Sequence, residues 1–295
     1  MRRRFQSVVG DFIENDEAFV LLLGDIGVFG FRDVMASHPT RVLNMGILEQ
    51  GMISFAAGLA LSGKIPIVHT ITPFLIERAY EQLKVDFGYQ HLTGKFISVG
   101  GSFEYSALGA THHGPADVVA LLGIPGFQIF LPASAAEAES LIRRHIRSDG
   151  LGYFRIVESE FTNEAIDVLA SSPQVLSDGS NCVVVAFGPS VTEALQVAKE
   201  LGLKLVYMNE ITNDSIGKLN RLLSQDPCST VALIQPFYEG SVVHLFLEGL
   251  RGKTIIDVGV PRQFIHEYGS PEDLKVALGL DAASIVEKIK GAVFL

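Results

Sequence analysis

The first half of the chain alternates short apolar runs with amphipathic segments. Apolar runs of this length without polar alternation are typical of parallel strands that are covered on both faces. We predict strands at Ala18–Leu23, Arg41–Met45, Lys64–Thr70, Lys95–Gly101, Phe127–Leu131 and Leu151–Val157. Helices are predicted at Phe5–Ile13, Phe74–Tyr89, Ala116–Leu122 and Ser134–Arg147, and a further one follows Asn44. This order predicts a mainly parallel sheet with helices on both faces.

The second half repeats this alternation after a segment rich in Ser, Asp and Glu, Glu158–Ser180, which loses the pattern and reads as a surface linker. Strands are predicted at Cys182–Phe187, Lys204–Met208, Thr230–Ile234 and Thr254–Val258. Helices are predicted at Val191–Leu201, Ser215–Leu223, Gly240–Glu248, Glu272–Leu278 and Ala283–Ile289. The predicted fold class is α/β, with two domains that each hold a mainly parallel sheet flanked by helices. We place the domains at 1–160 and 180–295, with a linker at 161–179.

The helix that follows Asn44 carries one unusual residue. Asn44 is a plausible N-cap, and the residues behind it are apolar on nearly every face, which predicts an interior helix. Its first turn nevertheless contains Glu49. A carboxylate that enters an apolar helix is costly to ionise unless a cation meets it. The alternative is a solvated acid at the helix mouth, where the helix dipole favours negative charge.

Composition and charge narrow the class of protein. The 295 residues carry a formal net charge of −10, and the Lys and Arg are scattered, which argues against a nucleic-acid ligand. No apolar run approaches the ~18–20 residues of a membrane span. The two cysteines, Cys182 and Cys228, have no CxxC or His partner spacing, so we expect reduced thiols in a cytoplasmic protein.

Candidate chemistry lies on loops that follow the predicted strands, where open α/β sheets bind ligands. The candidates are Asp25, Glu49, Phe74 and the run Thr111–Gly114. The adjacent His112 and His113 have no Cys or carboxylate at ligand spacing, so we predict no metal held by this chain. They suit proton transfer or hydrogen bonding, or they are solvated loop residues. The loop Gly24–Gly30 has GxxGxxG spacing, which is not the dinucleotide-binding pattern.

Several short motifs together resemble one family. Asn44–Gln50 (NMGILEQ) with Ala56–Ala60 (AAGLA) resembles the G-I-x-E-Q…A-A-G-L-A signature of transketolases and 1-deoxyxylulose-5-phosphate synthases. Arg78–Gln82 is similar to their R-A-x-E/D-Q helix, and Thr111–Gly114 to their T/S-H-Q loop. The family's order continues at Gly123–Pro125, Leu131–Ser134, Val258–Phe264 and Gly279–Val286. The resemblance spans nearly the whole chain and implies a pyrimidine-binding domain followed by a transketolase C-terminal domain.

The resemblance also implies roles for individual residues. Glu49 matches the acid that bonds N1′ of the thiamine diphosphate aminopyrimidine, and Phe74 matches the aromatic that stacks on this ring. Asp25 and Ile71 fall where the family approaches the cofactor. The residues implied to meet the substrate are His112, His113, His69 and, at the position of a substrate-phosphate arginine, Arg155. The catalytic pair would be Glu49 and His112.

The family's diphosphate module, G-D-G with an Asn some two dozen residues later, is missing. Gly24-Asp25-Ile26 lacks the third glycine. The resemblance therefore implies a split enzyme in which a partner chain holds Mg²⁺ or Ca²⁺ and the diphosphate, with the shared cofactor between chains of a two-plus-two heterotetramer. The activity implied is that of a transferase of carbohydrate metabolism, which moves a two-carbon ketol unit between a ketose and an aldehyde.

The substrate positions depart from the family. Leu108 replaces an Asp that reads a substrate hydroxyl, Gly100, Gly101 and Glu139 stand where cations often bind sugar phosphate, and Pro236-Phe237-Tyr238 replaces E-x-H. Since phosphate recognition relies on charge-assisted hydrogen bonds, we hypothesise a substrate other than a standard pentose phosphate, or cations supplied by the partner. The alternatives are the β chain of a 2-oxo-acid dehydrogenase, a non-catalytic paralogue and, more distantly, a flavin- or nucleotide-binding protein.

Overall fold

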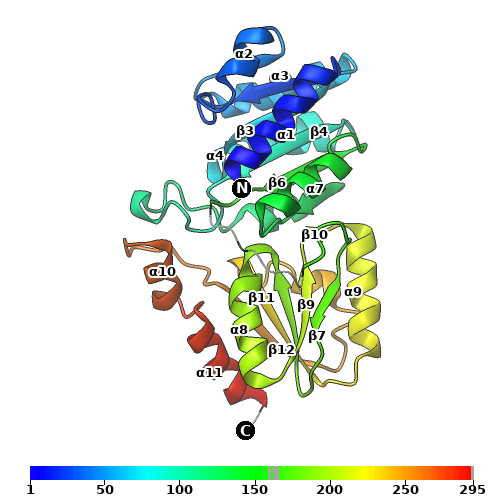
Figure 1. Ribbon diagram of the computed structural model, residues 1–295, viewed down its shortest axis with the longest axis vertical. Helices are drawn as coiled ribbons and strands as arrows, with labels where there is room; N and C mark the ends of the chain where they lie inside the picture. The colour runs from blue at the N-terminus through cyan, green and yellow to red at the C-terminus, as the bar shows by residue number, and fades with distance from the viewer. Residues whose placement is uncertain (159–160, 162–165, 294–295) are drawn as a thin grey trace.

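The computed structural model describes residues 1–158, 161 and 166–293 of the chain, and its two sheets stack one above the other in Figure 1. The first sheet has the strand order β10-β5-β6-β4-β3-β1-β2. Every neighbouring pair in it is parallel except β10 with β5. Its strands are β1 (Phe19–Leu23), β2 (Val42–Asn44), β3 (Ile65–Ile71), β4 (Gly94–Val99), β5 (Phe127–Phe130), β6 (Leu151–Arg155) and β10 (Glu210–Ile211).

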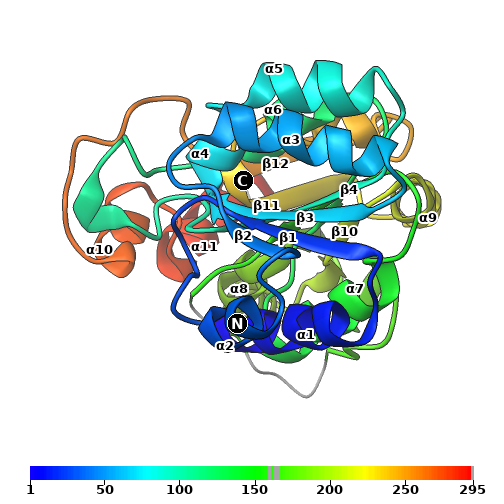
Figure 2. The same ribbon diagram turned by 90° about the horizontal axis from the view of Figure 1, so that it is seen from above.

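Helices cover both faces of this sheet, as the view from above shows (Figure 2). One face carries α1 (Arg2–Asn15), α2 (Arg32–Ser37) and α7 (Ala135–His145). The other carries α3 (Glu49–Leu61), α4 (Thr72–Ile76), α5 (Tyr80–Gln82) and α6 (Asp117–Leu122), together with the π-helix η1 (Leu83–Gly88). A 3₁₀ turn, η2 (Ser106–Leu108), lies in the loop between β4 and α6.

The second sheet has the order β12-β11-β8-β9-β7, and only β7 runs antiparallel to its neighbour. Its strands are β7 (Gln174–Ser177), β8 (Val183–Phe187), β9 (Lys204–Met208), β11 (Thr230–Tyr238) and β12 (Thr254–Val260). The flanking helices are α8 (Val191–Leu201), α9 (Asn213–Gln225), α10 (Pro271–Ala277) and α11 (Ala282–Val293), with 3₁₀ turns η3 (Gly188–Ser190) and η4 (Val243–Phe246).

The cores follow from the apolar strands. All five residues of β1 and of β8 are buried, because helices cover both sides of each strand. Within β1, Leu22 packs in the cluster that contains Met52 of α3, whereas Leu21 packs in the cluster that contains Phe5 of α1. This alternation fixes which face of the sheet each side chain can reach.

A buried polar network joins the two halves of the molecule. The carboxylate of Glu137 on α7 accepts hydrogen bonds from the Tyr207 hydroxyl at 3.0 Å and the Asn209 amide at 2.8 Å. Burial raises the pKa of Glu137 above its usual value. Directly after Asn209, β10 pairs with β5 and so adds a strand from the second half to the first sheet.

The predicted α/β class with two mainly parallel sheets is confirmed, and several individual predictions are wrong. The predicted helix Phe74–Tyr89 is broken into α4, α5 and η1, and Gly240–Glu248 forms only the short turn η4. The segment predicted as a linker contains the edge strand β7, while its residues 159–160 and 162–165 lie outside the described part. The domain boundaries themselves stay a prediction.

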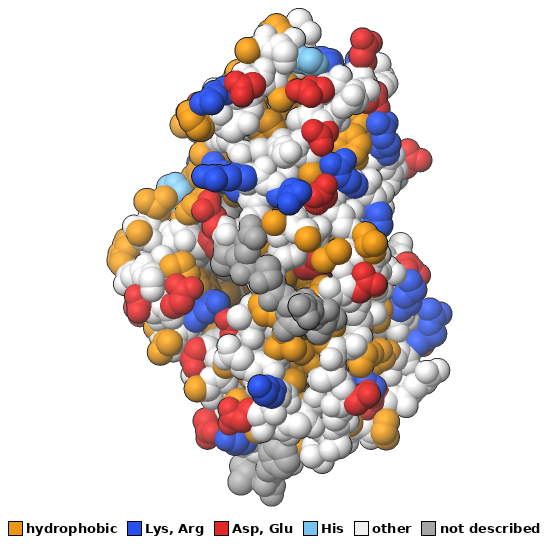
Figure 3. All heavy atoms as spheres, viewed as in Figure 1, with side chains coloured by type: hydrophobic (Ala, Val, Ile, Leu, Met, Phe, Trp, Pro, Cys, Tyr) orange, Lys and Arg blue, Asp and Glu red, His pale blue; other side chains and the backbone are white. Residues whose placement is uncertain are grey.

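The helix α3 is less enclosed than its sequence predicts. Met52 and Ile53 are buried against the sheet, but Phe55 is 44% exposed and the preceding Ile47 is 73% exposed. On the face shown in Figure 3, Lys and Arg side chains are interspersed with Asp and Glu. Among the described residues, no helix combines the length and apolar character needed to cross a membrane.

Candidate active site

Glu49 occupies the first turn of α3, and its carboxylate is enclosed by the protein. The residue is 2% exposed, and its Oε2 accepts a hydrogen bond from Nη1 of Arg78 at 2.8 Å. Arg78 is the cation that a buried acid at this position requires. The second oxygen, Oε1, is buried with no hydrogen-bond partner among the described residues. A buried carboxylate oxygen without a donor is an unmet acceptor, and a ligand N–H would satisfy it.

Arg78 also covers the ring of Phe74, one helical turn earlier. Its guanidinium carbon lies 4.1 Å from the ring centroid, a distance that allows a cation–π interaction. The amides of Glu77 and Arg78 both donate to the carbonyl of Pro73, where α4 ends. Arg78 belongs to one of the family motifs, but no role was predicted for it from the sequence. The i, i+4 spacing from Phe74 is the signal that could have found it.

His112 completes the group on the loop between β4 and α6. Its ring centroid lies 5.1 Å from that of Phe74, in an edge-on arrangement. Its Nδ1 lies 2.9 Å from the hydroxyl of Thr111. His112 is half-buried, so its ring is open to a ligand. The structure thus links Glu49 to Phe74 through Arg78, and Phe74 in turn contacts His112.

Asp25 and Asn44 form a second small cluster at the ends of β1 and β2. Oδ1 of Asn44 accepts from the amides of Asp25 at 3.1 Å and Gly46 at 3.2 Å, and its Nδ2 donates to Oδ1 of Asp25 at 3.1 Å. The prediction that Asn44 caps α3 is therefore wrong, because Leu48 is the N-cap residue and makes no side-chain cap. Asp25 is exposed in the left-handed region, with φ of 59°. Ile71, at the end of β3, is buried three residues before Phe74.

His113 and His69 are both buried, whereas His112 is half-buried. His113 is buried, and burial lowers its pKa. His69 is fully buried on the α1 side of β3, with its ring 4.6 Å from that of Phe5 and its Nδ1 2.8 Å from the carbonyl of Ile97. Burial lowers the pKa of His69 to about 4, so the ring is neutral near pH 7. A substrate role for His69 gains no support from this placement.

Arg155 lies at the end of β6 and is 1% exposed. Its Nε donates to Asp117 at 2.6 Å, and its Nη2 donates to the Ser102 hydroxyl at 3.0 Å and the Pro236 carbonyl at 3.2 Å. A Cβ at position 101 would lie 2.4 Å from the guanidinium carbon, so Gly101 is what leaves room for this buried arginine. The predicted phosphate-binding arginine is already engaged with a carboxylate.

The residues around Glu49 fit the pyrimidine half of thiamine diphosphate. The unmet Oε1 can accept from a ring N–H, and Phe74 offers an aromatic face once Arg78 moves aside. Among the described residues, no three His, Cys, Asp or Glu side chains gather as a metal-binding group. The fold and this site define a two-sheet α/β protein that carries a buried glutamate, Glu49, in the first turn of the helix that follows β2 of the first sheet.

Comparisons with known proteins place the chain in a family. Residues 1–162 match the family model "Transketolase, pyrimidine binding domain". The chain is 30% identical over 288 residues to an uncharacterized 33.6 kDa protein in the fasciation locus of Rhodococcoides fascians, covering 97% of this chain and 92% of that protein. It is 32% identical over 244 residues to a subunit of apulose-4-phosphate transketolase from Actinobacillus succinogenes, covering 80% of this chain and 74% of that subunit. The chain belongs to the transketolase family.

A solved structure described as "Split gene transketolase, inactive beta4 tetramer" has the same fold. It superposes with a TM-score of 0.83 and 23% identity, covering 100% of this chain and 98% of that one. Transketolase from Campylobacter jejuni matches with a TM-score of 0.81 and 16% identity, covering 98% of this chain and 46% of that protein. The chain thus spans less than half of the latter but nearly all of the split-gene chain.

Proposed function

We propose that this chain is the pyrimidine-binding subunit of a split transketolase that transfers a two-carbon ketol unit from a ketose to an aldehyde. The observation that carries the proposal is the buried carboxylate of Glu49, with one oxygen bonded to Arg78 and the other without a hydrogen-bond partner in the described part of the chain. The family match supports it, as do two relatives that are themselves named as single subunits of a transketolase.

Within this proposal, each residue of the group has a defined task. When bound, thiamine diphosphate would supply a nucleophilic carbon for breaking and forming the C–C bond next to a carbonyl group. Oε1 of Glu49 would accept a hydrogen bond from the ring N–H and so hold the proton at the ring nitrogen. Phe74 positions the ring by stacking. His112 is placed to hold or move a proton at the substrate oxygen, because its half-buried ring lies 5.1 Å from Phe74.

A partner chain is the second part of the proposal. The chain lacks the G-D-G…N module, so the diphosphate and its Mg²⁺ or Ca²⁺ would be held by another subunit. The exposed apolar residues at the entrance to α3, Ile47 and Leu48, with Phe55 further along the helix, are suited to contact that subunit. We propose an assembly of two copies of each chain.

Reconstitution tests this function. The chain is purified alone and together with a candidate partner of ~250–300 residues, a domain-sized length, that carries the module. Bound thiamine diphosphate and ketol transfer are then measured. Both are expected only with the two chains and a divalent cation. Oxidative transfer of an acyl group to lipoamide, with reduction of the lipoamide disulfide, would favour the 2-oxo-acid dehydrogenase alternative. Cofactor binding without any turnover would favour a non-catalytic paralogue.

A further inference from the structure

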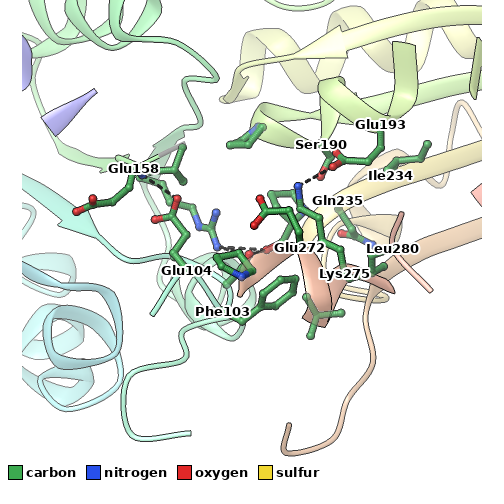
Figure 4. A pocket seen from close by; sticks show the side chains of 18 of the residues that line it. Phe103, Glu104, Glu158, Ser190, Glu193, Ile234, Gln235, Glu272, Lys275 and Leu280 are labelled. Carbon is green, nitrogen blue, oxygen red and sulfur yellow. Dashed lines mark hydrogen bonds and ion pairs between the residues drawn. The ribbon is translucent and has the colours of Figure 1, made fainter. Parts of the chain in front are cut away.

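A pocket lies between the two halves of the chain, at the start of the loop that carries His112 (Figure 4). Its volume is about 150 Å³. Residues from the β4–α6 loop, the end of β6, the start of α8, β11 and α10 line it. Its apolar walls include Phe103, Val157, Ile234, Val260 and Leu280. The pocket therefore has apolar walls and is lined at one side by the start of the loop that carries His112.

Both cations in the pocket wall already have carboxylate partners. Arg155 donates to Asp117 at 2.6 Å and is buried, and Nζ of Lys275 lies 2.6 Å from Oε1 of Glu193. None of the residues that the structure leaves undescribed is Lys or Arg, so the lining gains no cation from them. A phosphate dianion entering this pocket would meet no unpaired positive charge from this chain.

The remaining charged groups of the wall are acidic. Glu104, Glu158, Glu193 and Glu272 all line the pocket, and Glu272 is exposed in the first turn of α10. Glu193 pairs with Lys275, and Glu158 pairs with Arg2 at 3.3 Å. Among the described lining residues the carboxylates still outnumber the cations, and like charge at close range opposes an anionic ligand. Carboxylate oxygens accept hydrogen bonds, so they favour a ligand that donates them.

Gln235 adds an independent sign of a ligand. It lines the same pocket on β11 and is 2% exposed. Its Nε2 donates to the carboxylate of Asp257, and its Oε1 is buried with no partner among the described residues. A buried amide oxygen without a donor is costly, and a hydroxyl group from a ligand would satisfy it.

We propose that this pocket takes an uncharged, hydroxyl-bearing group and rejects a phosphate ester. We assign that group to the distal end of the sugar substrate, and this assignment rests on the proposed function. Its structural basis is the loop from Ser102 to Gly114, which lines the pocket at its start and carries His112 near its end. Because Arg155 is paired with Asp117 and Lys275 with Glu193, neither cation is available to a phosphate ester, whereas a hydroxyl group needs no cation.

The first test measures binding to the isolated chain, so it needs neither partner nor cofactor. Ribose and ribose 5-phosphate are each titrated into the chain at fixed ionic strength, and binding is followed by chemical-shift changes in the NMR spectrum of the protein. We expect ribose to bind at least tenfold more tightly than its phosphate. The variant Glu193→Gln frees Lys275 and should raise the affinity for ribose 5-phosphate at least tenfold. The matched control is Glu200→Gln, since Glu200 lies on the same helix and pairs with Lys290 away from the pocket.

A second variant and a kinetic measurement test the proposal further. Gln235→Leu should weaken ribose binding several-fold and leave the phosphate unaffected, with folding verified by an unfolding curve. Equal or tighter binding of ribose 5-phosphate to the unmodified chain, or no binding of ribose at all, would overturn the proposal. In the reconstituted enzyme, Glu193→Gln should shift kcat/KM toward a phosphorylated acceptor. A shift in binding without one in kcat/KM would refute the assignment to the substrate and leave the transferase function standing.

Discussion

Replacing Glu49 with Gln separates the chemistry of the proposed site from its stability. The substitution keeps the size of the side chain and an oxygen that can accept from Arg78. It removes the ionisable group that would share a proton with the cofactor ring. The expected results are therefore a large loss of ketol transfer and a small change in the free energy of unfolding.

The structure sets the size of both effects. Glu49 is buried but the Arg78 side chain is 40% exposed, so water compensates much of the lost ion pair. We expect a stability loss of about 1 kcal/mol or less, which corresponds to a fall in Tm of a few degrees. Proton transfer by a positioned group contributes roughly 10²–10⁴-fold to rate. The loss in kcat should then be at least about a hundredfold, or about 2.7 kcal/mol.

The assay uses the reconstituted enzyme at saturating thiamine diphosphate, with Tm and bound cofactor measured on the same preparation. Glu200→Gln is again the matched control, because it also removes a carboxylate with a cationic partner, here Lys290, but at an exposed site. Full activity of Glu49→Gln with cofactor bound would refute the role of Glu49. A loss of activity that simply follows unfolding would show a structural role instead.

Three further changes give measurable outcomes. His112→Gln should lower kcat at least about tenfold with little change in Tm, since the ring is half-buried; equal kcat would exclude proton transfer by His112. Asp117→Ala leaves the buried Arg155 charge unpaired and should cost about 3–5 kcal/mol of unfolding free energy. Adding Arg155→Met should restore part of it, and a lack of recovery in urea titrations would contradict the pairing. His69 has a folded pKa of about 4 against an ordinary 6.5, so unfolding free energy should fall as pH drops from 6.5 toward 4, by up to about 3 kcal/mol. His69→Gln should remove part of that pH dependence, since His145, whose pKa is also lowered to about 4, contributes over the same range, and an unchanged slope would argue against a role for His69.

Local sequence patterns predicted the elements that are buried along their whole length or on one regular face. The apolar runs of β1 and β8 are buried along their whole length, and α8 and β9 begin and end where their periodicity indicates. The edge strand β7 escaped prediction because only one of its neighbours is a strand and its burial is partial, so its sequence carries no apolar run. The predicted helix from Phe74 is interrupted after Ile76, where the carbonyl of Pro73 accepts from two successive amides, those of Glu77 and Arg78.

The site was predictable only where a motif is local. Glu49 and the loop of His112 each lie within a short run, so their positions beside predicted strands were clear. The partner of Glu49 is 29 residues away, and that of Lys275 is 82 residues away. Such pairings depend on how α3 meets the turn between α4 and α5, and on how α8 meets α10, which no local pattern contains. An acid at the start of an apolar helix indicates that a cation is needed, but only the structure identifies Arg78.

The contacts of Arg78 also bear on how the proposed site would receive its cofactor. The guanidinium holds one oxygen of Glu49 and covers the Phe74 ring, which are the two groups assigned to the aminopyrimidine. The Arg78 side chain is 40% exposed but the Glu49 carboxylate is buried, so a ligand that displaces Arg78 must itself supply a donor to this carboxylate. A ring that binds here replaces the cation–π contact with stacking and meets the unmet Oε1. In the unliganded chain, Arg78 therefore keeps a buried acid paired until a ligand with its own N–H arrives.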